Sequence, residues 1–408
     1  MKKYLSIALL SGALLMSGCG DSENFVFTNN TNVQVAPVCV DDAYTTNQDT
    51  TLTVNATNGV LANDTLNGAS IESFDGTSDE GGSVSVNADG SFTYTPPNNF
   101  FGATDTFTYT VTNDVGQTTC TVTITVVAVN GFFVDSVNGN DTTGSFNGGL
   151  PFQTVQAAVT AAGTNQDIIV RPGNYSGVVT LLDGQRLLGS GSSLVNPQGG
   201  VRPVFTGPIN MADGNTVDFV RVENAPDDSI VGDGQNHGTI SNCEIDGSGT
   251  FGISCEDSKG SWDISGNNIQ GNDSMALGIV VDSGMTVSAT QVTFRVNNNV
   301  INRCDFGAIS VTGLSSQEIR AQISGNSTTN TVNTGATIEG IAFSTSEVCA
   351  DITGNTNDDA YSLGQDTNAL MNVEQLSQLT VLNSGSATVE VPTGFDAATE
   401  VSDGVCGF

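Results

Sequence analysis

The feature that most constrains this chain is an irregular repeat of apolar residues in its second half. The clear copies place two isoleucines around four small or polar residues, as in Ile264-Ser-Gly-Asn-Asn-Ile269. Copies start 23 to 32 residues apart, at Leu187, Val217, Ile240, Ile264, Val296, Ile323 and Ile352. A period of this length is typical of a solenoid that buries one apolar rung per coil, so it predicts a parallel β-helix of about nine or ten coils.

Two further columns follow the same repeat. Asparagines recur at one corner, at Asn267, Asn299, Asn326 and Asn355, with Cys243 in that slot one repeat earlier. Stacked asparagines can hydrogen-bond one another along a solenoid, although turn chemistry alone also favours asparagine at corners. A second column of Gly-Ile or Gly-Ala-Ile segments ends at Ile253, Ile279, Ile309 and Ile341.

Residues 152–163 carry the one convincing helical pattern, with Phe152, Val155, Val159 and Ala162 on one stripe and Gly163 as its end. The stretches 134–141, 151–158 and 167–175 around it resemble the start of right-handed parallel β-helix proteins related to pectate lyases. This resemblance implies that the helix covers the open N-terminal end of the coil. We therefore expect a right-handed parallel β-helix domain over residues 131–408, with a C-terminal cap.

Residues 37–128 alternate apolar and polar residues, which indicates strands with one buried face. Phe107, Tyr109 and Val111 alternate with threonines, and residues 82–94 contain two short strands around an Asn87-Ala-Asp-Gly90 turn. Several short strands separated by turns predict a β-sandwich. The whole chain is thus expected to be all-β apart from the single helix.

The same segment resembles the bacterial immunoglobulin-like, cadherin-like tandem domains of surface proteins. The resemblance lies in Asp41-Asp-Ala-Tyr44, Gly59-Val-Leu-Ala-Asn-Asp64, Asp89-Gly-Ser-Phe-Thr-Tyr-Thr-Pro96 and Asp105-Thr-Phe-Thr-Tyr-Thr-Val111. It implies a spacer or adhesive module without catalytic residues. In such a sandwich the first and last strands are neighbours, so we expect a Cys39–Cys120 disulfide, the alternative being two buried free thiols.

The N-terminus, MKKYLSIALLSGALLMSGCG, has two lysines, an apolar run too short to cross a bilayer, and small residues before a cysteine. Met16-Ser-Gly-Cys19 resembles the bacterial lipoprotein cleavage box, although the family prefers leucine at Met16. We expect a signal peptide over 1–18, lipid attachment at Cys19 and a flexible tether over 19–36, the alternative being an ordinary signal peptide. Gly20, in place of an aspartate, favours the outer membrane or cell surface.

Charge limits the partners of the chain. Its formal charge is −33 at pH 7, although only 13% of the residues are charged. Nucleic acid and anionic lipid would be repelled by such a field, so we expect membrane contact only through the lipid. Polysaccharide or another surface protein is the expected partner.

The remaining cysteines leave the pairing open. Of eight cysteines in the chain, seven remain if Cys19 carries lipid, and an exported protein tends to oxidise them. Cys243 with Cys255 and Cys349 with Cys406 are conceivable pairs, which would leave Cys304 unpaired. No CxxC motif occurs and His237 is the only histidine, so these residues indicate no metal site.

The β-helix resemblance also implies polysaccharide lyases and glycoside hydrolases, which need carboxylates and a base on neighbouring coils. The catalytic candidates are Arg221, Asp227, Asp228 and His237. The alternative interpretation is a solvated surface pair for Arg221, which has Glu223 close by, and an exposed turn residue for His237.

Calcium is the one candidate cofactor, because the cadherin-like resemblance implies it and Asp41, Asp42, Asn63 and Asp64 form oxygen-rich loops. No spacing matches a defined calcium loop. The sequence as a whole favours a lipid-anchored surface protein with an adhesive or carbohydrate-contacting role. An extracellular lyase or hydrolase acting on an acidic polysaccharide is the alternative.

Overall fold

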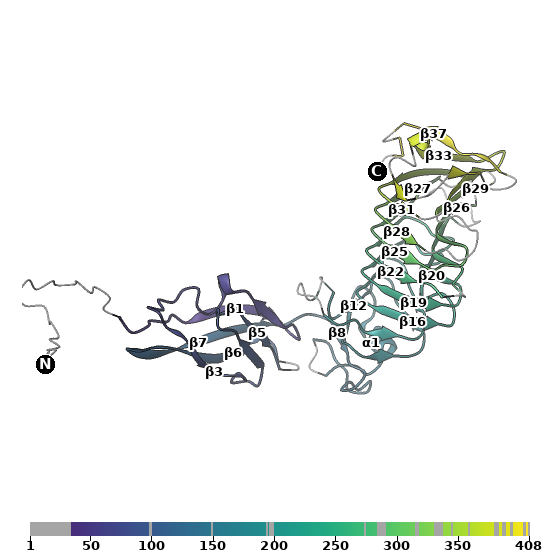
Figure 1. Ribbon diagram of the computed structural model, residues 1–408. Helices are drawn as coiled ribbons and strands as arrows, with labels where there is room; N and C mark the ends of the chain where they lie inside the picture. The colour runs from purple at the N-terminus through teal and green to yellow at the C-terminus, as the bar shows by residue number, and fades with distance from the viewer. Residues whose placement is uncertain are drawn as a thin grey trace, which may run out of the picture.

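The computed structural model describes residues 34–97, 100–147, 150–192, 195, 200–272, 275–283, 291–314, 318–329, 338–343, 346–357, 360–378, 383–385, 389–391, 395–402 and 405–406. Two bodies follow one another along the chain, a β-sandwich and then a tall coil of stacked strands (Figure 1). The predicted all-β class with a β-sandwich followed by a parallel β-helix is therefore confirmed.

The β-sandwich consists of a four-stranded and a three-stranded sheet. The first has the order β1 (Asp42–Asn47), β7 (Gly116–Val127), β6 (Ala103–Asn113), β3 (Ser70–Phe74). The second has the order β2 (Leu52–Val54), β5 (Phe92–Thr95), β4 (Ser83–Val86), and a 3-10 turn, η1 (Ala56–Asn58), follows β2. Phe107, Tyr109 and Val111 all point into the core, as their alternation predicted, and β4 and β5 form the predicted hairpin.

The coil has three sheets, which we call sheets 1, 2 and 3. Sheet 1 contains β8 (Phe132–Val134), β9 (Asp167–Val170), β12 (Arg186–Gly189), β15 (Asn215–Asp218), β18 (His237–Ser241), β21 (Ser261–Ser265), β24 (Val292–Asn297), β27 (Glu318–Ser324), β30 (Glu347–Thr353), β33 (Leu370–Glu374) and β37 (Thr399–Val401).

Sheet 2 contains β10 (Asn174–Tyr175), β13 (Val204–Phe205), β16 (Arg221–Ala225), β19 (Glu244–Ser248), β22 (Asn268–Gln270), β25 (Val300–Asn302), β28 (Ser327–Thr329), β31 (Thr356–Asn357) and β34 (Ser384–Gly385). Sheet 3 contains β11 (Val179–Thr180), β14 (Ile209–Asn210), β17 (Ile230–Val231), β20 (Phe251–Cys255), β23 (Leu277–Asp282), β26 (Gly307–Gly313), β29 (Ile338–Ala342), β32 (Tyr361–Gln365), β35 (Val389–Glu390) and the antiparallel β36 (Asp396–Ala397). A second 3-10 turn, η2 (Leu376–Gln378), follows β33.

The strands of the coil come in triplets, one strand for each sheet. In the described residues they run from β9–β10–β11 to β33–β34–β35, which makes nine successive triplets. The seven repeat starts from Leu187 to Ile352 lie opposite one another in sheet 1, so the predicted register is confirmed there. Their side chains are all buried inside the coil.

One predicted column is wrong by three residues at its last member. Ile309 pairs with Ile338, and not with Ile341, which pairs with Thr312. Because side chains alternate between the two faces of a strand, a shift of three residues places Ile341 on the opposite face from Ile338, which belongs to the interior core.

The asparagine ladder is confirmed and extends one rung further. The backbone nitrogen of Asn299 donates to the side-chain oxygen of Asn326 at 2.9 Å, and the side-chain nitrogen of Asn299 donates to the same oxygen at 3.0 Å. The same pairing links Asn267 to Asn299, Asn326 to Asn355, and Asn355 to Asn383. Cys243 begins the ladder, because its backbone nitrogen donates to the Asn267 side chain at 2.9 Å. These buried amides satisfy one another, which fixes the corner between sheets 1 and 2.

The helix α1 (Val155–Ala162) begins three residues later than its pattern. Thr154 caps it, since its hydroxyl accepts from the Ala157 amide, while Phe152 precedes the helix and bridges to Val134. Val155 and Val159 are buried against the first strands of the coil. The helix thus covers the start of the coil, as the resemblance implied.

Candidate functional site

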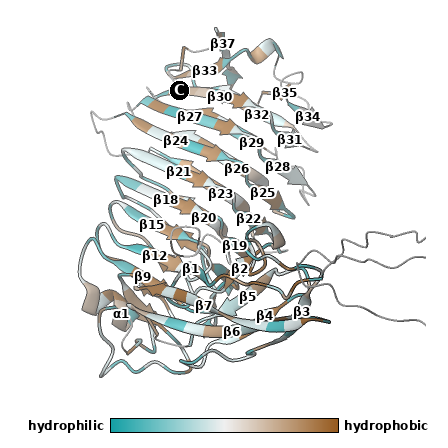
Figure 2. Cartoon of the chain, turned by 90° about the vertical axis from the view of Figure 1, so that its left-hand side faces the viewer, coloured by the Kyte–Doolittle hydropathy of each residue, from teal (hydrophilic) through white to brown (hydrophobic). Residues whose placement is uncertain are grey.

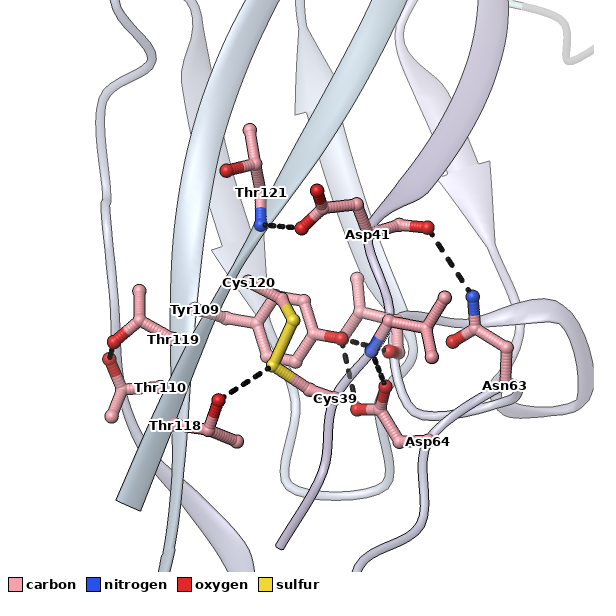
Figure 3. Close-up of a disulfide and its surroundings, with 12 residues drawn as sticks. Cys39, Asp41, Asn63, Asp64, Tyr109, Thr110, Thr118, Thr119, Cys120 and Thr121 are labelled. Atoms are coloured by element: carbon pink, nitrogen blue, oxygen red, sulfur yellow. Dashed lines mark hydrogen bonds between the residues drawn. A yellow bond between two sulfur atoms is a disulfide. The ribbon is translucent and has the colours of Figure 1, made fainter.

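One disulfide closes the β-sandwich, and several of the predicted site residues surround it (Figure 3). Cys39 and Cys120 are bonded, with 6.0 Å between their Cα atoms and 81 residues between them in sequence. The predicted pair is confirmed because β1 and β7 are neighbouring strands in register. The hydroxyl of Thr118 lies 3.7 Å from the Cys39 sulfur.

Three of the four side chains proposed for calcium, those of Asp41, Asn63 and Asp64, form hydrogen bonds near this disulfide. One Asp41 carboxylate oxygen accepts from the Thr121 amide at 2.8 Å. Asp64 accepts from the Val40 amide at 2.8 Å and from the Tyr109 hydroxyl at 2.9 Å. The Asn63 side chain donates to the Asp41 carbonyl at 3.5 Å. These bonds tie the loop before β1 to the loop at Asn63 and to β6.

Asp42 is the exception within this group. It is only 9% exposed, and its Oδ2 atom has no hydrogen-bond partner. Burial and the nearby charge of Asp64 raise its pKa to about 6. Among the described residues no three His, Cys, Asp or Glu side chains gather in a way that could hold a metal ion. Calcium therefore stays a prediction.

Arg221 lies on the outer face of sheet 2 within an ion-pair network. Its guanidinium lies 2.8 Å from Glu223, 2.9 Å from Asp246 and 3.9 Å from Glu244, which also pairs with Arg202 at 2.9 Å. Every partner is substantially exposed. This arrangement matches the surface-pair interpretation and not a base directed at a substrate.

The other catalytic candidates lie at different corners of the coil. Asp227 and Asp228 precede β17, at the corner between sheets 2 and 3, and Asp228 accepts from the Phe251 amide at 2.9 Å. Burial, together with Asp233 and Asp227, raises the pKa of Asp228. His237 begins β18 in sheet 1, is exposed, and accepts from the Ser261 amide at 3.1 Å. The structure does not bring these residues together with Arg221.

The outer face of sheet 1 carries two straight columns of side chains, which we call the polar ladder. The columns contain Thr216, Thr239, Asp263, Arg295, Gln322 and Asp351, and Asp218, Ser241, Ser265, Asn297, Ser324 and Thr353. Eight of these twelve side chains are neutral hydroxyls or amides, and all but the buried Asp218 are exposed or half-buried. Parallel strands repeat every ~4.8 Å, so the ladder offers hydrogen-bonding groups at that spacing along the coil. The repeat length alone predicted this stacking, although not which sheet would carry it.

Three cavities in the described part of the chain lie elsewhere. A cavity of about 240 Å³ lies between the start of α1 and the first coil and is lined by Gln153, Gln156 and Tyr175. Another, near Phe146 and Arg186, lies beside the start of sheet 1, and a third lies on the sandwich near Asn55. None contains a catalytic candidate.

The structure corrects one cysteine pair and confirms another. Cys349 and Cys406 are bonded, with 5.4 Å between their Cα atoms, which ties the C-terminal segment to sheet 1. Cys243 and Cys255 are both free, contrary to the proposed pair. Cys243 lies at the corner between sheets 1 and 2 and Cys255 ends a strand of sheet 3, so β19 and sheet 2 separate them. Cys304 is free as expected, and burial raises its thiol pKa to about 12.

The predicted signal peptide, Cys19 and most of the tether lie outside the described residues. The last tether residues, 34–36, already contact the sandwich, because the Asn113 and Asn67 side chains donate to the carbonyls of Val35 and Ala36. Within the described ranges, no helix combines the length and the hydrophobicity that a membrane crossing requires.

Fold and sites together define a two-domain all-β protein, in which an immunoglobulin-like sandwich precedes a parallel β-solenoid. Residues 34–128 match the family described as the bacterial cadherin-like domain. The sandwich is therefore a bacterial cadherin-like domain. Comparison with curated proteins and with solved structures gave no match. A cadherin-like domain joined to a β-solenoid fits a surface binding or carbohydrate-related role.

Proposed function

We propose that this chain is a lipid-anchored surface protein whose polar ladder binds an extended, neutral polysaccharide. The observation that carries the proposal is the ladder itself, with its predominantly neutral hydroxyl and amide groups in register over six coils. A polymer that lies along the coil can repeat the same hydrogen bonds on successive strands. Weak single contacts then add up through multivalency.

The charge of the chain selects among polysaccharides. With a formal charge of −33, the protein repels acidic polymers at low ionic strength, whereas neutral ones are unaffected. This argues against the alternative, a lyase or hydrolase acting on an acidic polysaccharide. The separation of Arg221, Asp228 and His237 around the coil gives that alternative no assembled acid–base pair.

A binding assay with immobilised neutral and acidic polysaccharides tests the proposal. We expect the wild-type protein to bind a neutral polymer, and the double variant Thr239→Lys/Ser265→Lys to lose that binding because two long side chains cover the ladder. Asn268→Lys, on the outer face of sheet 2, is the matched control and should bind as the wild type does. If the ladder variant binds equally well, the proposed face is wrong.

An assay for new reducing ends in the same mixtures tests the enzymatic alternative. Binding without product supports the proposal, and product formation contradicts a purely binding role. Anchoring is tested separately by mass spectrometry of the N-terminal peptide from the native membrane. We expect a lipid-modified Cys19, and loss of membrane association in Cys19→Ala.

A further inference from the structure

The outer face of sheet 1 is apolar, and not polar, on its first strands, β8, β9 and β12, which we call the foot of sheet 1. The second column of the polar ladder continues downward from Asp218 through Leu188, Ile169 and Phe133. These three side chains point out of the coil, yet they are 1%, 0% and 1% exposed. They form a cluster separate from the interior core, completed by Val195 and the partly buried Val129. Hydrophobic residues on an outer face need a cover.

The cover comes from chain segments at the domain junction. Val129 belongs to the four-residue connection between β7 and β8, and Val195 follows β12. Figure 2 shows the strands of sheet 1 rising above the cadherin-like domain, which lies at the foot of the coil. The apolar foot of sheet 1 therefore lies where the two domains meet.

Polar contacts between the domains surround this apolar cluster. The side-chain nitrogen of Asn47, at the end of β1, donates to the Val195 carbonyl at 3.1 Å. Arg171, only 8% exposed, pairs with Asp49 of the cadherin-like domain at 2.6 Å and with Asp135 of the coil at 3.3 Å. Its guanidinium carbon also lies 5.6 Å from the centre of the Phe133 ring. One buried cation thus links both domains to the apolar cluster.

The Arg171–Asp49 ion pair joins two domains that are both rich in acidic residues. Residues 34–128 contain eleven Asp and Glu and no Lys or Arg, and the whole chain has ten Lys and Arg against 43 Asp and Glu. Two acidic bodies repel one another unless a specific contact offsets the repulsion. Arg171 supplies such a contact, and burial keeps its ion pair with Asp49 from being screened by salt.

We propose that the foot of sheet 1 is a docking surface for the cadherin-like domain of the same chain, and that the two domains form one fixed joint. Small interdomain contacts usually permit relative motion. Here a short connection, an apolar cluster and a buried ion pair act together. The joint holds the polar ladder at a set orientation to the cadherin-like domain, and it leaves the ladder above the buried Asp218 accessible. This inference does not depend on what the ladder binds.

Small-angle X-ray scattering of the protein from residue 20 onward, at low and high salt, tests the joint. We expect one salt-independent arrangement for the wild type. The variant Asp49→Asn/Val195→Asp removes the ion pair and the cover, so its maximum dimension should vary with salt. Asparagine suits the left-handed backbone of Asp49, where φ is 56°, which keeps the turn intact. Protease cleavage at residues 128–131 should also rise by about tenfold, the factor for 1.4 kcal/mol.

Asp167→Asn is the matched control, because it removes an ion pair with Arg186 on the same sheet, where Arg186 is 43% exposed. This variant should scatter as the wild type does, and circular dichroism should show every variant folded. The proposal is wrong if the wild type already changes shape with salt. It is equally wrong if the folded joint variant keeps the wild-type scattering and cleavage rate.

Discussion

The two domains bury their apolar strands through different kinds of contact. The cadherin-like domain closes one core with strands far apart in sequence, and a disulfide joins residues 81 apart. The solenoid pairs each strand with the equivalent strand of the next coil, which lies 23 to 32 residues on for the repeats from Leu187 to Ile352. It also repeats one corner ladder from Cys243 to Asn383. A destabilising substitution should therefore affect the whole cadherin-like domain, whereas in the solenoid it should affect only the coils next to the substituted residue.

Removing the Cys39–Cys120 disulfide should have the largest effect on stability. Cys39→Ser/Cys120→Ser frees a loop of 81 residues in the unfolded chain, which is expected to destabilise the cadherin-like domain by about 4 kcal/mol. Its melting temperature should fall by about 20 °C in calorimetry. Cys349→Ser/Cys406→Ser is the matched control. It should loosen only the C-terminal segment, and a collapse of the entire solenoid would contradict the comparison.

Breaking one rung of the asparagine ladder should have a smaller, local effect. Asn299→Ala removes the acceptor for Asn267 and the donor for the Ile264 carbonyl, which leaves buried groups unpaired. We expect a loss of about 3 kcal/mol, with faster hydrogen exchange confined to the neighbouring coils. Asn268→Ala, next to Asn267 in sequence and on the exposed face of sheet 2, should change exchange little. Uniformly faster exchange along the coil would argue against neighbour-limited stability.

Titration of Asp42 should produce an intermediate effect restricted to the cadherin-like domain. Its folded pKa of about 6 exceeds the ordinary 3.8, so the folded state retains a proton that the unfolded state releases. Stability should fall as pH rises between these values and stay level above about 6. Asp42→Asn should remove this loss and stabilise the domain at pH 7.5 by about 3 kcal/mol, but not at pH 3.

Chemical denaturation at both pH values measures this difference, with the exposed Asp114→Asn as control. Equal effects of Asp42→Asn at the two pH values would refute the assigned titration. The same samples test calcium. A melting temperature raised by calcium in the wild type but not in Asp42→Asn would support the calcium hypothesis, and no shift on chelation would end it.

Substitution of Arg221 should have the smallest effect. Its partners Glu223, Glu244 and Asp246 are 32–53% exposed, and ion pairs of this kind contribute less than about 1 kcal/mol. Arg221→Gln should leave the solenoid transition within about 1 °C of the wild type in calorimetry. A large drop would show that the network does more than cover a surface.

Much of the fold could be predicted because its strands and corners follow patterns that can be read directly in the sequence. Leu187 through Ile352 recur once per coil, and Asn267 through Asn355 mark the corners, so strand pairing in sheet 1 follows from the repeat. The prediction fails at Ile341 because Ile338, three residues earlier and on the opposite face of the strand, is the residue that pairs with Ile309 in the interior core. The Cys39–Cys120 bond followed from the expected neighbourhood of first and last strands.

The candidate sites were less predictable because they depend on which corner or face a residue reaches. Asp227, Asp228 and His237 are close in sequence, yet β17 separates the aspartates from the histidine. The proposed Cys243–Cys255 pair failed for the same reason, since twelve residues carry the chain across sheet 2. Nearness in sequence is a poor guide when every few residues turn a corner.

The sequence by itself determined the strand periodicity, the two domains and the corner ladder, because each of these arises from contacts between residues at a fixed spacing. The tertiary structure alone decided the joint. Phe133, Ile169 and Leu188 look like ordinary core residues, although Val195 and the domain connection at Val129 cover them from outside the coil. Arg171 looks like part of a turn until Asp49 of the cadherin-like domain is placed beside it. Burial of this outer face and pairing of a charge far away in sequence both depend on segments that meet only in the folded chain.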